Sequence, residues 1–370
     1  MILSGIFPPD SGGPAKFAST FQQWLNQKKQ TSTVLTLVDG PSQQRYSNNS
    51  SLIRLSRNRN LLFRITSTVF WLGKLQKTHS LVIANGLFIE IAILSLFMKM
   101  SYSVKIPGDI VWERARNCKY TNLDVEEFQS QQLNIKYRIF RFLFLRSIKG
   151  AIHVIVPSKQ LEELCQLWGV SNERITVVHN SVDTSLFSPN SSALKKNDVI
   201  SVSRLVKWKC IDEIIHACVK QKASLLIVGT GPEEENLRKL ADDLNGNVSF
   251  VGDVSQINLP GLYQESRLFV LNSDFEATSY SLLEARSCGL PTIARGSTGS
   301  DEIINSGVDG FLCGPKTDIS LGVALQELLE DSKKAELFAK IARQSVVENF
   351  DMESNYQKIL DVISGIQIER

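Results

Sequence analysis

At 370 residues, the chain is too long for one ordinary hydrophobic core and predicts two α/β domains of about 150–190 residues each. Hydrophobic residues make up 43% of it and charged residues 21%, a composition that excludes a disordered chain. The net charge of +3 conceals an asymmetry. Residues 1–186 hold 22 Lys and Arg against 12 Asp and Glu, whereas residues 187–370 hold 19 against 26. The basic first half favours an anionic partner: a phosphorylated substrate, a nucleic acid or an anionic membrane.

Cysteine spacing and apolar runs limit the class of protein further. None of the six cysteines has the spacing of a zinc site, so we expect buried free thiols in a reducing compartment. The longest apolar run, residues 87–98, is interrupted by Glu90 and is too short to span a bilayer. No stretch resembles a signal peptide. We therefore expect a cytoplasmic protein, with peripheral attachment to the inner face of the plasma membrane as a further option.

In chain order, short apolar runs alternate with helical patterns. A strand end at 2–7 enters a loop rich in Gly and Pro, and a helix follows at 15–28; so little strand precedes the loop that we expect a few residues to be missing there. Further strands are predicted at 33–38, 81–84, 102–106 and 151–156, and the polar stretch 42–51 is predicted to be a loop. The second half predicts strands at 199–203, 224–228, 248–251, 268–271 and 291–294, a linker at 183–197 and a last helix at 352–363. This alternation predicts parallel sheets in an α/β fold.

The strongest functional signal is a pair of glutamates eight residues apart, Glu276 and Glu284. Glu276 would lie on the loop after the strand at 268–271, where ligands of open α/β sheets bind. Small residues follow it and would bring backbone N–H groups to the start of a helix, ready to bind phosphate. These residues are Ala277, Thr278, Ser279 and Tyr280. The ordinary alternative is a pair of solvated glutamates, and the flanking residues favour the site.

A basic turn from Arg204 to Lys209 lies between the strand at 199–203 and a predicted helix. Arg204 offers a forked donor and Lys209 a point charge, and both suit a diphosphate leaving group. The residues alone leave open that this is a solvated basic turn.

Three small turns follow strands or precede helices, and each permits close approach of the backbone to a ligand. They contain Gly12 and Gly13, Gly229 and Gly231, and Thr298 with Gly299. Each is equally compatible with an ordinary turn or helix cap.

Taken together, these segments resemble the C-terminal domain of family 4 glycosyltransferases of the GT-B fold. They are Ser203-Arg204-Leu205 with Lys209, Gly229-Thr230-Gly231, Phe250-Val251-Gly252, Glu276 with Glu284, and Pro291-Thr292-Ile293-Ala294. Looser matches are Phe7-Pro8-Pro9 with Gly12-Gly13, Val156-Pro157-Ser158, and Val178-His179-Asn180. The resemblance covers nearly the whole chain.

The resemblance implies an architecture of two Rossmann-like domains whose parallel sheets face each other across a cleft. Residues 1–186 would form the acceptor domain, and residues 187–350 the nucleotide-sugar-binding domain. A C-terminal helix within 351–370 would cross back to the first domain.

It also implies roles for the residues already named. Arg204 and Lys209 would hold the donor diphosphate, Glu276 would face the transferred sugar, and Glu284 would bind the ribose. The backbone at Gly252 would meet the base. Donor contacts are also implied for the glycine turns and for residues 277–280, although Thr298 stands where the family has glycine. No Asp-x-Asp metal motif ends a strand, so we expect a metal-independent enzyme without a cofactor.

The first domain departs from the family where many members carry a catalytic His. The matching stretch lacks the His and instead has a Gly-Asp-x-x-Trp-Glu signature, with Gly108, Asp109, Trp112 and Glu113. Asp109 is the candidate to receive the acceptor proton or to orient the acceptor hydroxyl. A loop-capping role for this Asp is the alternative.

Two basic amphipathic segments bear on partners. Residues 54–77, from Arg54 to Lys77, mix Arg and Lys with large apolar residues, and residues 136–149 do the same. Helices of this kind can lie on an anionic membrane surface. The alternative is a core helix with a solvated basic face.

The resemblance therefore implies a retaining hexosyltransferase. It would move a sugar from a nucleotide diphosphate sugar to a glycan or polyprenyl-linked acceptor in cell-surface polysaccharide assembly, with no nucleic-acid partner. The alternatives are a GT-B sucrose-type synthase or phosphorylase that acts on a soluble acceptor, and a non-catalytic sugar-nucleotide-binding protein.

Overall fold

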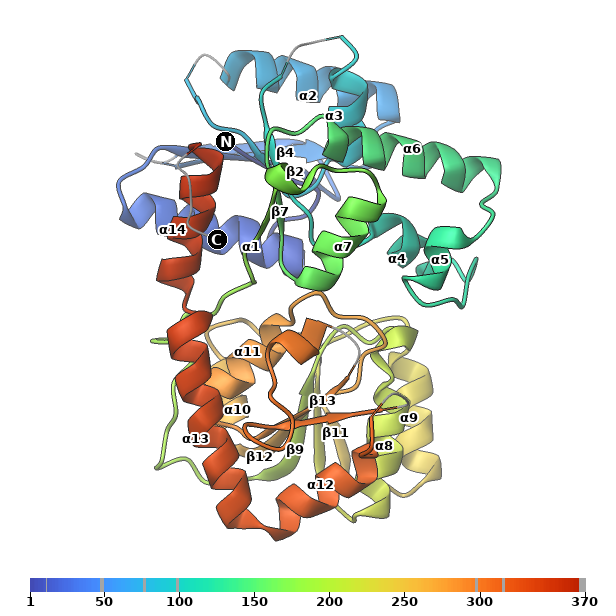
Figure 1. The fold of residues 1–370 in the computed structure, drawn as a ribbon, viewed down its shortest axis with the longest axis vertical. Coiled ribbons are helices and arrows are strands. Elements are labelled where there is room, and N and C mark those ends of the chain that lie inside the picture. Colours follow the sequence, from blue (N-terminus) through green and yellow to red (C-terminus); the bar gives the residue numbers. More distant parts are fainter. Residues whose placement is uncertain are drawn as a thin grey trace. The chain divides into compact units, whose positions relative to one another are not determined.

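A computed structural model describes residues 1–10, 12–46, 50–75, 78–97, 100–296, 299–314 and 317–365. The chain forms two compact units: Met1–Val178 with the segment from Tyr356 is unit 1, and His179–Asn355 is unit 2 (Figure 1). The domain boundaries predicted at 186 and 351 lie eight residues after Val178 and five before Tyr356. The segment predicted as a linker lies within unit 2, where Phe187 is fully buried.

Unit 1 is built on an eight-stranded sheet in the order β3-β4-β2-β1-β5-β6-β7-β8. Its strands are β1 Ile2–Ser4, β2 Ser32–Val38, β3 Gln43–Tyr46, β4 Ser50–Ser56, β5 Ile83–Ala84, β6 Ser103–Lys105, β7 Val154–Val156 and β8 Ile175–Val177. All pairings are parallel except that of β3 with β4. The strand order therefore reverses beside β1, between β2 and β5.

Helices connect the strands of unit 1. They are α1 Gly13–Gln27, α2 Leu61–Leu75, α3 Phe88–Leu94, α4 Ile110–Asn117, α5 Glu127–Ser130, α6 Ile135–Lys149 and α7 Lys159–Leu167, with a 3₁₀ turn at Asn172–Arg174. The last helix, α14 Met352–Ile363, has the predicted bounds. Its Tyr356 is buried against the rings of Phe17, Phe21 and Trp24 of α1. This aromatic contact joins the C-terminal segment to unit 1, as expected.

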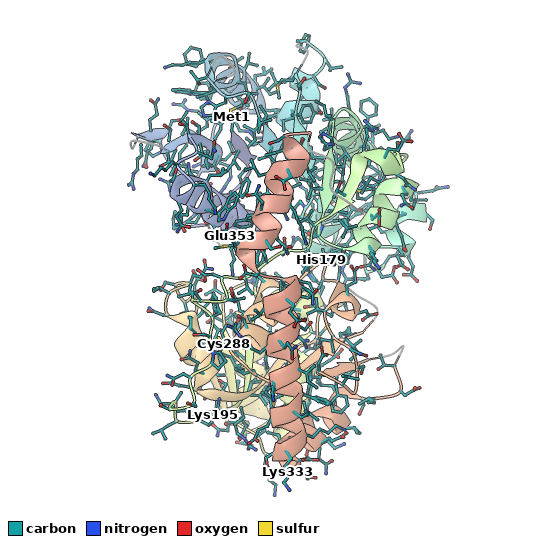
Figure 2. All side chains as sticks on the ribbon, turned by 60° about the vertical axis from the view of Figure 1, so that its left-hand side comes forward. Met1, His179, Lys195, Cys288, Lys333 and Glu353 are labelled. Atoms are coloured by element: carbon teal, nitrogen blue, oxygen red, sulfur yellow. The ribbon has the colours of Figure 1, made fainter. Side chains whose placement is uncertain are left out.

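Unit 2 has a six-stranded parallel sheet in the order β11-β10-β9-β12-β13-β14. Its strands are β9 Asn197–Val202, β10 Leu225–Val228, β11 Val248–Phe250, β12 Ser266–Leu271, β13 Thr292–Arg295 and β14 Phe311–Cys313. Its helices are α8 Ile211–Lys220, α9 Glu234–Asp243, α10 Leu259–Gln264, α11 Tyr280–Ser287, α12 Leu321–Glu330 and α13 Ser332–Asn349, with 3₁₀ turns at Lys207–Lys209 and Gly299–Glu302. Figure 2 shows α13 rising through unit 2 from near Lys333.

Both faces of the unit 2 sheet are covered. Val199 of β9 belongs to one buried apolar cluster, and its neighbour Ile200 belongs to the other. Leu225 and Leu226 of β10 divide between the two clusters in the same way. Because side chains alternate across a strand, a sheet with helices on both sides needs near-continuous apolar strands. This need explains why the strand predictions of this half were accurate to within two residues.

Three sequence expectations fail in detail. Residues 42–51, predicted to be a loop, contain the strand β3 and the start of β4. Their polar sequence is compatible with an edge strand, because β3 pairs on one side only. The short strands β8 and β14 were not predicted. Five cysteines are buried as expected, but Cys118 is exposed.

A buried ion pair anchors α11 in unit 2. Arg286 is fully buried, and its Nη2 lies 2.6 Å from Asp309 Oδ2. Its Nη1 donates to the Asp309 carbonyl and to Thr292 Oγ1 of β13. This pair therefore fixes the helix that carries Glu284 against the sheet.

We expect Arg286→Leu to lower the free energy of unfolding by about 3–5 kcal/mol, because the Asp309 carboxylate would stay buried without its partner. Lys196→Met is the control, since Lys196 pairs with Glu265 at the surface and is 63% exposed. That change should cost less than about 1 kcal/mol. Urea unfolding of both variants measures the difference, and equal losses would contradict the role given to the buried pair.

Candidate functional site

The strand order of unit 2 defines where a ligand would bind. The chain runs outward from β9 to β10 and β11, then returns to the other side of β9 with β12, β13 and β14. The order therefore reverses between β9 and β12, and open α/β sheets bind ligands outside the carboxyl ends of the strands at such a point. The two strongest sequence motifs follow these two strands.

A salt bridge crosses the point of reversal. Lys209 Nζ, on the loop after β9, bonds to the carboxylate of Glu276, on the loop after β12. Their side chains are 16% and 13% exposed, so the pair is mostly buried but reachable from solvent. The backbones of the loops meet as well, since Asp274 N donates to Trp208 O at 2.8 Å. The structure thus brings together two of the four residues predicted to meet at one site.

Arg204 lies on the same loop as Lys209 and is exposed. Leu205, the next residue, is fully buried and its backbone N donates to Thr230 O at 2.9 Å. The backbone that carries Arg204 is therefore fixed while its guanidinium faces solvent. This is the arrangement that an anion-binding side chain needs before its ligand arrives.

Gly229 and Gly231 serve the packing of two loops. A Cβ on Gly229 would lie 2.0 Å from Ser203 O, and one on Gly231 would lie 2.2 Å from Leu205 O. Gly229 also has a φ of +126° and donates from its N to Gly252 O at 2.7 Å. Both glycines are therefore required by loop-to-loop contact. Gly252, predicted to meet the base, has a φ of +72° and lies near the start of the loop after β11.

Gly299 packs against the backbone of the Glu276 loop. A Cβ on Gly299 would lie 1.7 Å from Ala277 O and 2.5 Å from Glu276 O. Its N donates to Glu276 O at 2.6 Å. Gly299 therefore fixes the backbone of Glu276, a structural role that adds to the predicted donor contact. Thr298, its predicted companion, lies outside the described residues.

An ionic cluster that the sequence analysis missed lies under the same loop. Arg295, at the end of β13, pairs with Glu213 at 2.6 Å and with Asp274 at 3.2 Å. Its Nε also donates to the Asn272 carbonyl at 3.1 Å. Arg295 thus links α8 to the residues that lead into Glu276. In the sequence, Arg295 is only an Arg directly after a predicted strand. Its role could not be predicted, because its acidic partners come from distant parts of the chain.

Glu284 lies in the second turn of α11 and is 2% exposed. Its Oε2 accepts a hydrogen bond from Tyr263 Oη at 3.0 Å, and Tyr263 is fully buried. Burial, and next the charge of Glu284, raises the pKa of the Tyr263 phenol well above its usual value, so the phenol is a donor at neutral pH. The Glu284 carboxylate therefore has a fixed orientation. Tyr263 is a second residue that sequence reasoning did not single out.

The segment between the two glutamates starts a helix, as predicted. Ser279 is the N-cap of α11, and its hydroxyl accepts from Leu282 N. Ala277 and Thr278 are buried, and Tyr280 is the first helical residue. Asn180 Nδ2 donates to Thr278 O at 2.9 Å, which ties the segment to the first residues of unit 2.

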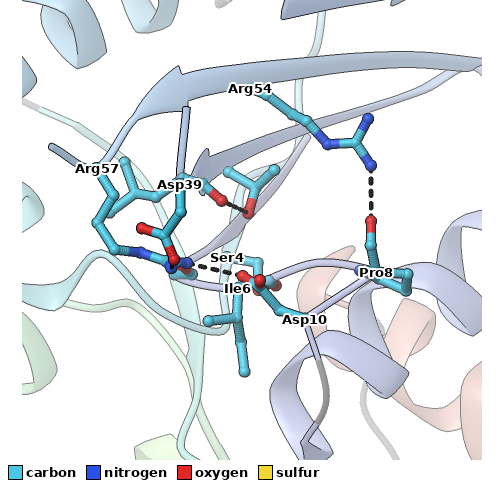
Figure 3. A network of polar contacts seen from close by, with 10 residues as sticks. Ser4, Ile6, Pro8, Asp10, Asp39, Arg54 and Arg57 are labelled. Atoms are coloured by element: carbon cyan, nitrogen blue, oxygen red, sulfur yellow. Dashed lines mark hydrogen bonds and ion pairs between the residues drawn. The ribbon is translucent and has the colours of Figure 1, made fainter. Parts of the chain in front are cut away.

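In unit 1, two arginines near the end of β4 hold the loop that leads to Gly12 and Gly13 (Figure 3). Arg57 lies 2.7 Å from both Asp10 and Asp39, and Arg54 donates to the Pro8 carbonyl at 2.6 Å. Gly12 has a φ of +131°, and Gly13 opens α1 without a side-chain cap. The loop is thus held at the start of a helix, beside the reversal of the unit 1 sheet.

Two buried polar residues of unit 1 face the first turns of α1. Asn85 is 1% exposed and donates from Nδ2 to Pro14 O at 2.9 Å. Lys105 is 2% exposed, with its Nζ 4.7 Å from the centre of the Phe17 ring. Burial lowers the pKa of Lys105 to about 7. The sequence analysis named neither, because short strands do not reveal which polar side chains are buried.

Asp109 takes the alternative role that the sequence allowed. It is the N-cap of α4, with Oδ1 accepting from Val111 N at 2.9 Å and from Trp112 N at 3.1 Å. Its Oδ2 accepts from Gln129 Nε2 at 3.0 Å. Burial raises the pKa of this carboxyl, which is 1% exposed. Oδ1 therefore holds the start of α4, and Oδ2 links it to α5.

Most of the described cations in the basic segment 54–77 are engaged in contacts within unit 1. Besides Arg54 and Arg57, Arg64 pairs at 2.6 Å with Glu90, which is buried. Arg59 and Lys74 lie over the rings of Phe63 and Trp71, and Lys77 lies outside the described residues. Three of the five described cations therefore serve internal contacts. In the part of the chain that the structure describes, no helix is both long enough and apolar enough to cross a bilayer.

Comparison with known proteins identifies the type of unit 2. Residues 183–345 match the family model of glycosyl transferases group 1. The chain is 33% identical over 208 residues to the N-acetyl-alpha-D-glucosaminyl L-malate synthase of Bacillus anthracis, an alignment that covers 51% of this chain and 54% of that protein. The chain thus spans about half of the length of the curated relatives that it matches.

Solved structures match over nearly the whole chain. Sucrose-phosphate synthase of Thermosynechococcus elongatus has a TM-score of 0.81 at 18% identity, covering 99% of this chain and 98% of that one. HepE of Anabaena, solved in complex with UDP-glucose, has a TM-score of 0.78 at 20% identity, covering 98% and 99%. The chain therefore has the GT-B fold, as the sequence analysis expected. At these identities the likeness defines the fold alone.

We expect Gly299→Ala to destabilise the protein by about 1–3 kcal/mol and to displace Glu276, because the added methyl group meets two backbone carbonyls that cannot move separately. Gly322→Ala is the control: in the described structure, nothing lies within 4 Å of a Cβ at this helical position. That change should leave stability unchanged or raise it by up to about 1 kcal/mol. Thermal unfolding compares the two, and a neutral Gly299→Ala would contradict the packing role.

Proposed function

We propose, starting from the glycosyl transferases group 1 match of residues 183–345 within a GT-B fold, that this chain is a retaining glycosyltransferase. It moves a hexose-type sugar from a nucleotide diphosphate sugar to a glycan or lipid-linked acceptor, in cell-surface polysaccharide assembly. A lipid-linked acceptor would be met at the inner face of the plasma membrane. The observation that carries the proposal is the salt bridge between Lys209 and Glu276 across the strand reversal of unit 2.

The charges near this salt bridge support binding of a diphosphate. Lys209 is held by Glu276 in the structure, and Arg204 on the same loop is exposed. An incoming diphosphate carries negative oxygens that can share Lys209 with Glu276 and recruit Arg204 as a forked donor. As the bond from the sugar to the diphosphate breaks, these two cations stabilise the charge on the leaving oxygen. The reaction then needs no metal ion to supply that charge.

Glu276 and Glu284 would divide the rest of the donor between them. Glu276 has one carboxylate edge toward Lys209 and is 13% exposed, which suits contact with the hydroxyls of the transferred sugar. Glu284 is oriented by Tyr263 and would accept hydrogen bonds from the ribose hydroxyls. Gly252 would lie near the base, and the N-terminus of α11 near the phosphates.

The transfer step follows a front-face route in this proposal. The acceptor oxygen bonds to the anomeric carbon on the side from which the diphosphate leaves, so the configuration is retained. The acceptor proton passes to the departing phosphate oxygen. No covalent sugar–enzyme intermediate is required.

Glu276→Gln is expected to slow donor turnover by about 100-fold or more, because it removes charge next to the reacting sugar and weakens the hold on Lys209. Glu235→Gln, an exposed glutamate on α9, is the control and should retain full activity. Hydrolysis of UDP-, GDP-, ADP- and TDP-sugars by the purified chain provides the assay without a known acceptor. Thermal shift with each donor reports binding separately.

The same assay separates the competing functions. A Glu276→Gln variant that hydrolyses its donor at the wild-type rate would remove the assignment. Donor binding by the wild-type chain without hydrolysis or transfer would favour a sugar-nucleotide-binding protein. Dependence on inorganic phosphate or a free sugar would indicate a phosphorylase or a sucrose-type synthase.

Asp109→Asn is expected to keep donor turnover and transfer within about threefold of wild type, because the amide oxygen still caps α4. Asp109→Ala should lower the free energy of unfolding by about 0.5–2 kcal/mol through loss of the cap. Thermal unfolding and the donor assay are measured on both variants. If Asp109→Asn instead abolishes transfer to an acceptor at unchanged stability, the carboxylate takes part in the reaction.

A further inference from the structure

We propose that the solvent-facing side of α6, together with a cavity at its C-terminal end, binds the surface of an anionic lipid bilayer. This face belongs to unit 1 alone, and the proposal does not depend on the transfer reaction. It replaces residues 54–77, whose cations mostly serve internal contacts, as the surface to which a membrane would attach.

One stripe of α6 combines exposed apolar side chains with cations. It consists of Ile135, Ile139, Phe142, Arg146 and Lys149. The spacings of four, three, four and three residues place all five on one side of the helix. The three apolar side chains are 69%, 54% and 64% exposed. Because one exposed large apolar residue is ordinary but an aligned series is not, this stripe marks a binding surface.

The stripe ends in a cavity of about 620 Å³. Its lining is Ser95, Met100, Ser101, Tyr102, Phe142, Leu145, Arg146, Lys149 and Gly150. Arg146 and Lys149 supply positive charge, and Phe142 and Leu145 supply apolar walls. Among the described residues, the buried Nε of Arg146 has no hydrogen-bond partner. The volume is within the usual range for small-molecule sites. Such a cavity suits a phosphate headgroup that continues into a hydrocarbon chain.

The surroundings extend the apolar surface. Directly after α3, which packs against α6, Leu96 and Phe97 are 56% and 81% exposed. Ile152, after α6, is 49% exposed. Leu96 and Phe97 follow Ser95, and Ile152 follows Gly150, so these exposed apolar side chains belong to segments that line the cavity.

The positive charge of α6 indicates that the surface it binds is anionic. Helix α6 carries five Lys and Arg and no Asp or Glu. Anionic headgroups attract such a helix, and its apolar side chains can enter the boundary between headgroups and acyl chains. A nucleic acid would satisfy the cations but leave the isoleucines and phenylalanines in water. An anionic bilayer can pair with the cations and also bury the apolar side chains.

The cavity lies away from the functional edge of its own sheet. Tyr102 and Gly150, which line the cavity, precede β6 and β7, so the cavity is at the amino ends of these parallel strands. Gly12 and Gly13 follow β1 at the opposite, carboxyl edge. Attachment through α6 would therefore leave the carboxyl edge of unit 1 open to an acceptor.

Sedimentation with vesicles tests the proposal on the full chain. We expect binding to phosphatidylcholine vesicles that contain about one third phosphatidylglycerol, a composition at which juxtamembrane cations contribute measurably, and weaker binding as salt is raised. Arg146→Gln with Lys149→Gln should weaken binding about 30-fold, from roughly fivefold for each cation. Ile139→Ser with Phe142→Ser should weaken it at least as much. Donor hydrolysis should remain unchanged in both double variants. Loss of vesicle binding can therefore be distinguished from loss of the proposed reaction.

The matched control is Lys220→Gln with Lys239→Gln, which removes two exposed lysines from α8 and α9 of unit 2. It should change vesicle binding by less than about twofold, since neither lysine lies on the proposed face. Equal loss in this control and in the Arg146 and Lys149 variant would overturn the proposal. So would displacement of the chain from vesicles by soluble glycerol phosphate, which would assign the cavity to a free phosphate ester. A wild-type dimer that Ile139→Ser with Phe142→Ser converts to monomer, without vesicle binding, would make the face an interface between copies.

Discussion

The candidate site of unit 2 depends on the close approach of backbone loops at the carboxyl edge of its sheet. Gly229, Gly231 and Gly299 each contact a neighbouring carbonyl at a distance that excludes a Cβ atom. Gly229 and Gly231 pack against the loop after β9, and Gly299 packs against the loop after β12. The two loops meet directly where Asp274 N donates to Trp208 O, and there Lys209 reaches Glu276. A side chain at any of the three glycine positions would displace one of these two loops, and with it Lys209 or Glu276. The positions of the two charged side chains therefore depend on backbone packing as well as on ion pairs.

The two units solve the same structural problem with different interactions. The strand order reverses beside β1 in unit 1 and beside β9 in unit 2. In each unit an irregular loop lies at this point and must be fixed in position. Unit 2 uses glycine contacts and the Arg295 cluster. Unit 1 uses Arg57 and Arg54, which hold the loop leading to Gly12 through carboxylate and carbonyl contacts. Arg54, Arg57 and Arg295 thus have structural roles, whereas the exposed Arg204 remains available to a ligand.

The basic character of the first half has two separate causes. Part of it is internal: Arg54, Arg57 and Arg64 are engaged by carbonyls and carboxylates of unit 1. Another part lies on α6, where cations accompany exposed apolar side chains. Net charge does not distinguish these uses, because a cation whose charge is balanced by a neighbouring carboxylate, such as Arg57 or Arg64, adds little to the attraction of a distant surface.

The sequence by itself determined the α/β class, most of the parallel strands, the last helix and the residues of the Glu276 and Arg204 motifs; β4, β8 and β14 were not predicted. These features are local, since they depend on apolar runs and on the residues that follow them. Only the tertiary structure decided the partners: Tyr263 for Glu284, Arg295 for Asp274, and the N-cap role of Asp109. It also decided that the polar residues before β4 form an edge strand. Such facts depend on contacts between segments distant in sequence, and no local pattern encodes which polar side chains will meet.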